Sequence, residues 1–199
     1  LFPWEILPNI KEFTLRLGAS LSPDRFDNPQ ENVWIAKTAN IYDTAYIAGP
    51  CIIDEGAEVR HCAFIRGSVI VGKNAVVGNS TELKNCLLFD GVQVPHYNYV
   101  GDSVLGYKAH LGAGAITSNV KSDKTPVTVK HSDTNTVLST ELRKFGAVVG
   151  DYTEVGCKTV LCPGTVIGRE CIIYPQSRVR GVVNGGSIYK DPEHIIKRQ

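Results

Sequence analysis

The chain has 199 residues, and its 21 Lys and Arg nearly balance its 20 Asp and Glu, so the formal net charge is +1. Such a balance excludes a general attraction to nucleic acid or to an anionic membrane. No apolar run reaches the roughly 18 residues of a transmembrane helix, and the N-terminus lacks a secretory signal pattern. The length predicts one or at most two domains with a buried core. Since the chain opens on Leu1 and contains no Met, we expect its start to be trimmed.

Six cysteines are present, at positions 51, 62, 86, 157, 162 and 171, and they form no C-x-x-C pair. The sequence therefore offers little support for a zinc-finger or thioredoxin-like site, and we expect no metal. We interpret the cysteines as reduced thiols that pack as small hydrophobic side chains, rather than as disulfides. This interpretation predicts a reducing compartment, the cytoplasm.

Residues 1–32 are predicted to form a first unit, a short helix followed by a connector. Apolar residues recur there at helical spacing, at Ile6, Ile10, Phe13 and Leu17. The helix should run over about 8–17, with Pro8 in its first turn and Gly18 as its C-terminal cap. Residues 22–32 contain two prolines and should be extended. The helix either shields the open end of the next unit or contacts a neighbouring subunit, and both alternatives are open.

Residues 33–184 form the second unit, which carries a six-residue period. An apolar side chain occupies every sixth position in ten consecutive repeats: Ile35, Ile41, Ile47, Ile53, Val59, Ile65, Val71, Val77, Leu83 and Phe89. An α-helix turns by ~100° per residue and would spread this series over three faces, whereas an even spacing keeps it on one face of a strand. A single strand of this length would be on the order of 150 Å long. The chain must therefore turn at every hexapeptide, which predicts an all-β parallel β-helix rather than an ordinary sandwich.

Seven glycines directly follow members of the apolar series and its continuations: Gly72, Gly78, Gly106, Gly112, Gly150, Gly156 and Gly168. Glycine adopts a positive φ without steric cost, as tight corners require. We therefore expect these glycines to form the corners of the coils.

Two stretches interrupt the period. The first lies at Pro95, and we expect residues 94–100 to bulge or loop before the series resumes at Tyr99, Leu105 and Leu111. The second covers 119–145, an excursion loop in which 127–130 and 136–138 are predicted to pair as a hairpin around Ser132 and Asp133. Insertions in repeat proteins usually lie on one functional edge, so we look for a site at these two breaks.

Residues 185–199 leave the repeat and form a predicted C-terminal tail. Asp191-Pro192-Glu193 is typical of a helix start, with Asp as the cap, Pro in the first turn and an acid near the positive end of the dipole. Lys197 and Arg198 suit the other end of a short helix.

The segment 95–102 is the richest in groups that could perform chemistry. A neutral His96 at a loop edge can act as a general base, while Arg66 and Lys84 can bind an anion such as a phosphate. If one coil is three hexapeptides, residues 18 apart lie one above the other, so Arg66 and Lys84 should stack. His96 lies 12 residues beyond Lys84, near a different edge. A complete site therefore needs edges from two neighbouring subunits.

The same residues carry a resemblance to a known family. The segments I-R-G from Ile65, K-N from Lys84, H-x-x-Y-x-G-D from His96 and G-A-G-x-I-T-x-N from Gly112 resemble the acetyltransferase domain of the bifunctional enzyme that makes UDP-N-acetylglucosamine. They also resemble the C-terminal domain of archaeal sugar-phosphate nucleotidylyltransferases, whose R-K-x-G-A-x-x-G stretch has its counterpart at 143–150. The resemblance covers about 60–184 and implies a left-handed β-helix, a homotrimer and an acetyl-CoA-dependent reaction.

The resemblance also implies roles for individual residues. His96 would deprotonate the attacking amine, and Arg66, Lys84 and Tyr99 would hold the sugar phosphate. The backbone at Ala113 would supply an oxyanion donor to the thioester. The acetyl-CoA arm would lie near Asn119, Cys157 and Pro175. The sequence departs from the family at the substrate-binding positions 110 and 124, where His110 replaces an Asn and Lys124 is the nearest counterpart of a loop lysine, and at Cys157, which replaces a small hydroxyl residue.

The implied function is transfer of an acetyl group to an amino-sugar phosphate, such as glucosamine 1-phosphate, or to a nucleotide-linked amino sugar. No Gly-rich nucleotide loop of the G-x-G-T-R kind occurs, so we expect a stand-alone enzyme without the nucleotidylyltransferase half. One alternative is a non-catalytic β-helix that serves as a trimerisation or regulatory subunit. Another is a metal-dependent hydratase resembling the γ-class carbonic anhydrases, which His61, His96 and His110 suggest but whose histidine spacing they do not match.

Overall fold

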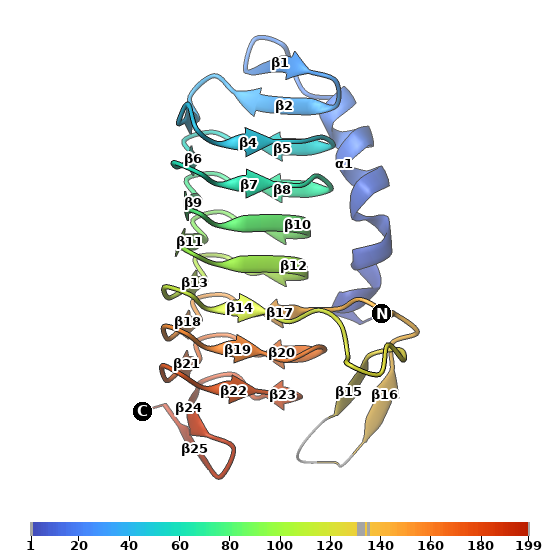
Figure 1. Cartoon of the computed structure of the whole chain (residues 1–199), viewed down its shortest axis with the longest axis vertical. Helices are drawn as coiled ribbons and strands as arrows, with labels where there is room; N and C mark the ends of the chain where they lie inside the picture. Colours follow the sequence, from blue (N-terminus) through green and yellow to red (C-terminus); the bar gives the residue numbers. More distant parts are fainter. Residues whose placement is uncertain (1, 131–133, 135, 199) are drawn as a thin grey trace.

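Short parallel strands, stacked coil upon coil, make up most of the molecule (Figure 1). The structure is a computed structural model that describes residues 2–130, 134 and 136–198. Each coil passes in turn through three stacks of strands, which we call faces. The chain runs from the first face to the second and then to the third, and from the third face it returns to the first face in the next coil. The predicted parallel β-helix is confirmed.

The three faces consist of strands that pair in parallel with their counterparts in the next coil. The first face contains β4 (Tyr46–Ile47), β7 (Phe64–Ile65), β14 (Ile116–Thr117), β19 (Val160–Leu161) and β22 (Arg178–Val179). The second contains β2 (Val33–Ala36), β5 (Cys51–Ile53), β8 (Val69–Val71), β17 (Ala147–Val149), β20 (Thr165–Ile167) and β23 (Val182–Val183). The third contains β3 (Asn40–Ile41), β6 (Glu58–Val59), β9 (Val76–Asn79), β11 (Gln93–His96), β13 (His110–Leu111), β18 (Glu154–Val155), β21 (Ile172–Ile173) and β24 (Ser187–Asp191). Two longer strands, β10 (Glu82–Leu88) and β12 (Tyr99–Leu105), pair with the first face through their beginnings and with the second through their ends.

Side chains that alternate inward from the three faces fill one continuous core. Ile53, Ile65, Leu83, Leu111 and Leu161 are all completely buried in it. Burying an aliphatic side chain of this size contributes roughly 1.5–3 kcal/mol, so the six-residue period is also the main source of stability.

The first predicted break is not a loop, and two members of the apolar series were assigned wrongly. Leu88, rather than Phe89, is the buried residue, and Phe89 is 51% exposed. Likewise Val100, rather than Tyr99, points into the core. Residues paired between coils are 18 apart up to Glu82, which pairs with Phe64. In the next coils, as far as Ile116, they are 17 apart, and Glu82 there pairs with Tyr99. The corner between the first and second faces is therefore one residue shorter in these coils, and no bulge is needed near Pro95, because β11 pairs with β9 in regular register.

The glycines also have a different role from the one expected. None of the seven has a positive φ, and the corners instead place residues such as Asn74, Tyr97 and Lys158 in that conformation. The glycines allow close approach between coils: a Cβ on Gly78 would lie 1.5 Å from the carbonyl oxygen of Pro95, and one on Gly156 would lie 2.4 Å from the backbone nitrogen of Pro175. Any side chain at these positions would push neighbouring coils apart.

The N-terminal helix lies along the flank of the solenoid rather than over its end (Figure 1). A 3₁₀ helix, η1 (Pro3–Asn9), leads into α1 (Ile10–Ala19), which contacts β5, β8 and β10. Pro8 is therefore in the 3₁₀ segment, and Gly18 is not a cap: a Cβ there would lie 2.3 Å from the Trp34 ring. Neither described helix has the length and apolar character that a membrane span requires. The predicted extended connector contains β1 (Phe26–Gln30), which pairs antiparallel with β2.

The excursion after β14 contains the predicted hairpin, formed by β15 (Thr128–Lys130) and β16 (Val137–Ser139). Its expected turn at Ser132 and Asp133 lies outside the described residues. Val127, Val129 and Phe145 pack with Trp4, Leu7 and Ile10 into a second apolar cluster. This cluster covers outward side chains of the second face, so the N-terminal helices and the excursion together cover that face.

The predicted C-terminal helix is wrong, because the tail forms a strand. Asp191 does cap a turn, accepting hydrogen bonds from the backbone nitrogens of Glu193 (2.8 Å) and His194 (2.9 Å). The chain then reverses into β25 (His194–Lys197), which pairs antiparallel with β24. So few residues gain little as an isolated helix, whereas strand pairing satisfies the backbone groups of the last coil.

Candidate functional site

Four of the predicted site residues lie in one column, at the corner where each coil passes from the third face to the first. We call this corner the His96 edge. His96 ends β11, and its carbonyl oxygen accepts a hydrogen bond from the Gly114 nitrogen (2.9 Å). In the following coils the carbonyl oxygen of Ala113 accepts from Lys158 (2.8 Å) and that of Cys157 accepts from Gln176 (2.8 Å). His96, Ala113, Cys157 and Pro175 therefore succeed one another along this edge.

The turn between β13 and β14 presents Ala113 with an available backbone donor. Gly112 donates to the Val155 carbonyl (2.7 Å) and Ala115 donates back to the Gly112 carbonyl (3.0 Å), which closes the turn. Gly114 at its apex has a φ of 69°, a conformation that favours glycine. Within the described part of the chain, no acceptor takes the N–H of Ala113. A free N–H on a partly buried residue can stabilise a developing oxyanion.

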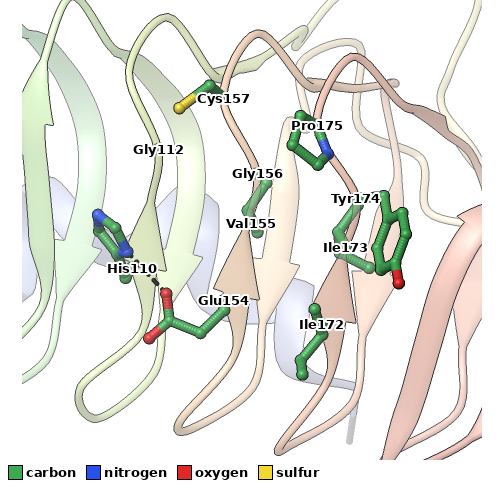
Figure 2. Close-up of a pocket in the computed structure, with 10 residues that line it drawn as sticks. All are labelled: His110, Gly112, Glu154, Val155, Gly156, Cys157, Ile172, Ile173, Tyr174 and Pro175. Carbon is green, nitrogen blue, oxygen red and sulfur yellow. Dashed lines mark hydrogen bonds and ion pairs between the residues drawn. The ribbon is translucent and has the colours of Figure 1, made fainter.

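A hollow of about 360 Å³ opens on the outer surface of β13, β18 and β21, beside this edge (Figure 2). Its lining is mostly apolar and includes Ile173, Tyr174 and Pro175, with Cys157 at its upper end. At the opposite end the Nδ1 of His110 lies 2.7 Å from Oε2 of Glu154. The hollow therefore combines an apolar wall with one polar pair, an arrangement typical of small-molecule sites.

Arg66, Lys84 and Asn119 lie at a different corner, where the coil passes from the first face to the second. We call this corner the Lys84 edge. Lys84 Nζ lies 2.8 Å from Oδ1 of Asp102, which also accepts a hydrogen bond from Asn85 (2.9 Å). Asn119 donates to the other oxygen of Asp102 and to the phenol of Tyr99 (3.2 Å). The structure thus places Asn119 with the proposed phosphate-binding residues, away from Ala113, Cys157 and Pro175.

The predicted stacking of Arg66 and Lys84 is confirmed, because β7 and β10 pair in register directly before them. Both cations are already paired within the chain: Arg66 lies 2.8 Å from Glu82, and Lys84 contacts Asp102. The hydrogen bond that the Arg66 guanidinium donates to the Glu82 carboxylate raises the pKa of Arg66. The Lys84 edge is therefore balanced in charge, and an anion that binds there must compete with two carboxylates or recruit further cations.

Tyr99 lies between the two edges on the first face, three residues after His96. Its hydroxyl folds back over Gly101, where a Cβ would lie only 2.4 Å from that oxygen, so a side chain at this position would displace the Tyr99 phenol. Burial, reinforced by the nearby carboxylates of Asp102 and Glu82, raises the pKa of the Tyr99 phenol. The neutral phenol can therefore both donate and accept hydrogen bonds at physiological pH.

The last two predicted residues are spread apart. His110 lines the hollow, on the third face. Lys124 lies in a turn after β14, where its nitrogen donates to the Lys121 carbonyl (3.0 Å), and the structure gives its side chain no contact with the other predicted residues. Among the described residues no three His, Cys, Asp or Glu side chains gather as a metal would require.

Sequence reasoning missed four polar residues that contact the two edges or line the hollow: Asn98, Glu82, Asp102 and Glu154. Asp102 belongs to the G-D motif, and Glu82 precedes Lys84 by two residues, so both had a signal in the sequence. Glu154 pairs with His110 only because the excursion lies between adjacent coils, so that residues 44 apart face each other. Asn98 is buried. Its signal in the sequence was an amide at a position where the repeat places an inward-pointing side chain.

Comparison with known proteins agrees with this architecture. A "Bifunctional protein GlmU" from Methanococcus vannielii is 32% identical over 188 residues, covering 85% of this chain and 45% of the relative. A "Bifunctional sugar-1-phosphate nucleotidylyltransferase/acetyltransferase" from Sulfurisphaera tokodaii is 32% identical over 177 residues, covering 79% of this chain and 43% of the relative. The chain thus spans less than half the length of these relatives. A hexapeptide transferase family protein from Anaplasma phagocytophilum has a similar solved structure, with a TM-score of 0.51, 16% identity and coverage of 84% of this chain and 79% of that one.

The family of GMPPB C-terminal domains matches residues 47–183, which include both edges and the excursion. Together with the relatives, this match confirms the resemblance to the acetyltransferase domain of the bifunctional enzyme and the left-handed β-helix that the resemblance implies. Since the match covers more than half of its length, the chain belongs to the GMPPB C-terminal domain family.

Proposed function

We propose that this chain transfers an acetyl group from acetyl-CoA to the amine of an amino-sugar phosphate, such as glucosamine 1-phosphate, or of a nucleotide-linked amino sugar. The observation that carries the proposal is the column at the His96 edge, which combines a candidate base, a free backbone N–H and a largely apolar hollow. The Sulfurisphaera tokodaii relative, whose name includes acetyltransferase, supports it.

In the proposed reaction the amine nitrogen attacks the thioester carbonyl carbon, and a C–N bond forms. His96 accepts the proton that the nitrogen loses, while the N–H of Ala113 stabilises the negative charge on the carbonyl oxygen. The C–S bond then breaks, and the CoA thiolate leaves and takes up the proton that His96 accepted. The pantetheine arm of acetyl-CoA would follow Cys157 and Pro175 along the apolar wall of the hollow. Removing the apolar part of this arm from water is favourable.

The Lys84 edge is the proposed acceptor site. Arg66 and Lys84 would contact the phosphate, Tyr99 would hydrogen-bond the sugar, and Asn119 would hold the Tyr99 hydroxyl in place. His110 and Lys124 would contribute further contacts to the acceptor. Because both cations are paired with carboxylates, charge-assisted bonds to a phosphate become favourable only if a neighbouring chain adds donors to the site.

We therefore propose a homotrimer in which the His96 edge of one chain meets the Lys84 edge of the next. The second face is covered by the N-terminal helices and the excursion. The first and third faces, the His96 edge and the partly exposed Lys84 edge are the surfaces left for a neighbour. All six cysteines are free, which is compatible with our proposed location in the cytoplasm.

The proposed function is tested by incubating the purified chain with acetyl-CoA and a panel of acceptors: glucosamine 1-phosphate, glucosamine 6-phosphate, UDP-linked glucosamine and unphosphorylated glucosamine. Release of the CoA thiol is followed by a chromogenic disulfide, and the product is checked by mass spectrometry. We expect acetylation of a phosphorylated or nucleotide-linked acceptor well above that of free glucosamine. Thiol release that never exceeds the background without acceptor would contradict the proposal.

A further inference from the structure

Asn98 stands out within the repeat. The register between coils aligns it with the inward residues two positions after each His96-edge corner, and the other members of this column are small: Ala45, Ala63, Thr81, Ala115, Thr159 and Ser177. Asn98 alone carries an amide, and it is only 2% exposed. Burying an amide is unfavourable unless its hydrogen bonds are satisfied, so a specific arrangement must stabilise it.

The side chain of Asn98 makes three hydrogen bonds, all with backbone groups near the proposed reacting centre. Its Oδ1 accepts from the nitrogen of His96 (3.1 Å). Its Nδ2 donates to the carbonyl oxygens of Gly112 (2.8 Å) and Ala115 (3.0 Å), which flank Ala113. One buried side chain therefore joins the backbone of the candidate base to both ends of the turn that carries the candidate oxyanion donor.

The smaller residues of this column lack such a bridge. Thr159 donates to the carbonyl of Tyr174 (3.2 Å), and Thr81 donates to that of Val94 (3.0 Å). The Thr81 hydroxyl also accepts from the nitrogen of Asn98 (3.3 Å), but neither threonine caps the nitrogen of its own corner. Accepting from one segment and donating twice to another requires an acceptor and two donor hydrogens, which a carboxamide has and a hydroxyl does not. The amide therefore occurs in the coil where the His96 backbone and the turn that carries Ala113 must keep a fixed distance.

We infer that Asn98 is the positioning residue of the site: it fixes the backbone of His96 relative to the N–H of Ala113. This inference rests on the proposed function for its catalytic meaning. The bridge works together with a direct bond, since the Gly114 nitrogen donates to the His96 carbonyl (2.9 Å). Without Asn98 that single bond would remain, and the distance between base and oxyanion donor would vary.

The experiment compares Asn98→Thr with Thr153→Ala. The first gives this coil the residue that two other coils already have in this column, so the fold should accept it. The second removes a buried hydroxyl that donates to the Gly168 carbonyl (2.9 Å) at the corner between the second and third faces, away from the site. Two readouts are taken: steady-state acetyl transfer, and amide hydrogen exchange at His96, Gly114 and Ala115.

For Asn98→Thr we expect kcat to fall by roughly 10–100-fold, as for other residues that orient a reacting group, with the KM for acetyl-CoA within about twofold of the parent. Exchange at His96 and Gly114 should become faster, while Thr153→Ala should change neither readout at those positions. We do not expect Asn98→Gln to retain the parent activity, because the longer side chain would misplace both the amide oxygen and the amide nitrogen.

Equal turnover and equal exchange protection in Asn98→Thr and the parent would overturn the inference. A parent chain that acetylates none of the acceptors would instead contradict the proposed function, and the exchange measurement would then still decide whether Asn98 holds the two segments together. A kcat loss without any change in exchange would also count against positioning.

Discussion

Lys84 and Asp102 form the least exposed ion pair on the described surface of the solenoid: Nζ lies 2.8 Å from Oδ1, and the Asp102 side chain is 5% exposed. Asp102 and Asn85 have φ values of 48°, and both lie at the shortened corners between the first and second faces. The carboxylate at one shortened corner thus lies against the ammonium of Lys84 in the preceding coil. The same Lys84 side chain is therefore part of the packing of these coils and of the proposed acceptor site.

Asp102→Asn should destabilise the protein, because it leaves the Lys84 ammonium without its counter-charge. Breaking a fully buried pair costs ~3–5 kcal/mol, and because the Lys84 side chain is 25% exposed we expect a loss of about 2 kcal/mol in the free energy of unfolding. Urea denaturation measures it. The control is Glu82→Gln, which breaks the more exposed pair with Arg66 and should cost less than about 1 kcal/mol. Equal losses in the two variants would show that the burial of Asp102 has no special role.

Gly18→Ala should reduce stability even though it improves helix propensity. In an exposed helix this change stabilises by up to ~1 kcal/mol. Here the new Cβ would meet the Trp34 ring at 2.3 Å, and overpacking of this kind typically costs about 1–3 kcal/mol. The net change should be a lower melting temperature, while Ala19→Ser on the exposed side should shift stability by less than ~0.5 kcal/mol. A higher melting temperature for Gly18→Ala would mean that α1 can move away from the solenoid.

The sequence predicted the solenoid well because its core depends on a local period. The prediction was wrong at Phe89 and Tyr99, because each lies beside an apolar residue, Leu88 or Val100, that is the buried one. The six-residue series could therefore be continued through a shortened corner without meeting a polar residue. The prediction of a C-terminal helix was wrong because an Asp such as Asp191 can cap either a helix or a turn. In the site, the stacking of Arg66 and Lys84 followed from their 18-residue spacing, whereas the pairing of Lys84 with Asp102 depends on corner geometry that the period does not contain.

The Tyr99 phenol predicts a stability change at alkaline pH. Burial raises its pKa, so the folded state holds the proton more tightly than the unfolded state does, where the pKa is about 10. The associated stability is complete below pH ~10 and is lost as the pH rises through the folded-state value. Thermal unfolding at pH 9 and pH 11 should therefore show a smaller drop for Tyr99→Phe than for the parent. Tyr46→Phe, at a residue that is 63% exposed, serves as the control and should keep the parent's drop.

Mixed oligomers test whether two chains share each site. Chains with His96→Ala and chains with Lys84→Ala should each have low activity, the second mainly through a raised KM for the phosphorylated acceptor. Unfolded together and refolded as a mixture, they should recover roughly a quarter of the parent activity, because random assortment pairs an intact His96 edge with an intact Lys84 edge at that frequency. Sedimentation should give three times the chain mass of 21.7 kDa. Absence of recovery in mixtures that do sediment as trimers would place both edges of a site in one chain.

His96→Ala tests the proton acceptor of the proposed reaction. An amine that attacks a thioester must lose a proton, and removing a general base typically lowers kcat by roughly 10²–10⁴-fold. The KM for acetyl-CoA should change little, because the proposed cofactor contacts at Ala113, Cys157 and Pro175 are intact. His61→Ala is the matched control: His61 lies on the same edge two coils earlier, and its ring contacts Thr44 at 3.1 Å, outside the proposed site. That variant should keep the parent kcat. Near-normal turnover in His96→Ala would assign the proton transfer to another group, and His110, oriented by Glu154 at 2.7 Å, would be the residue to replace next.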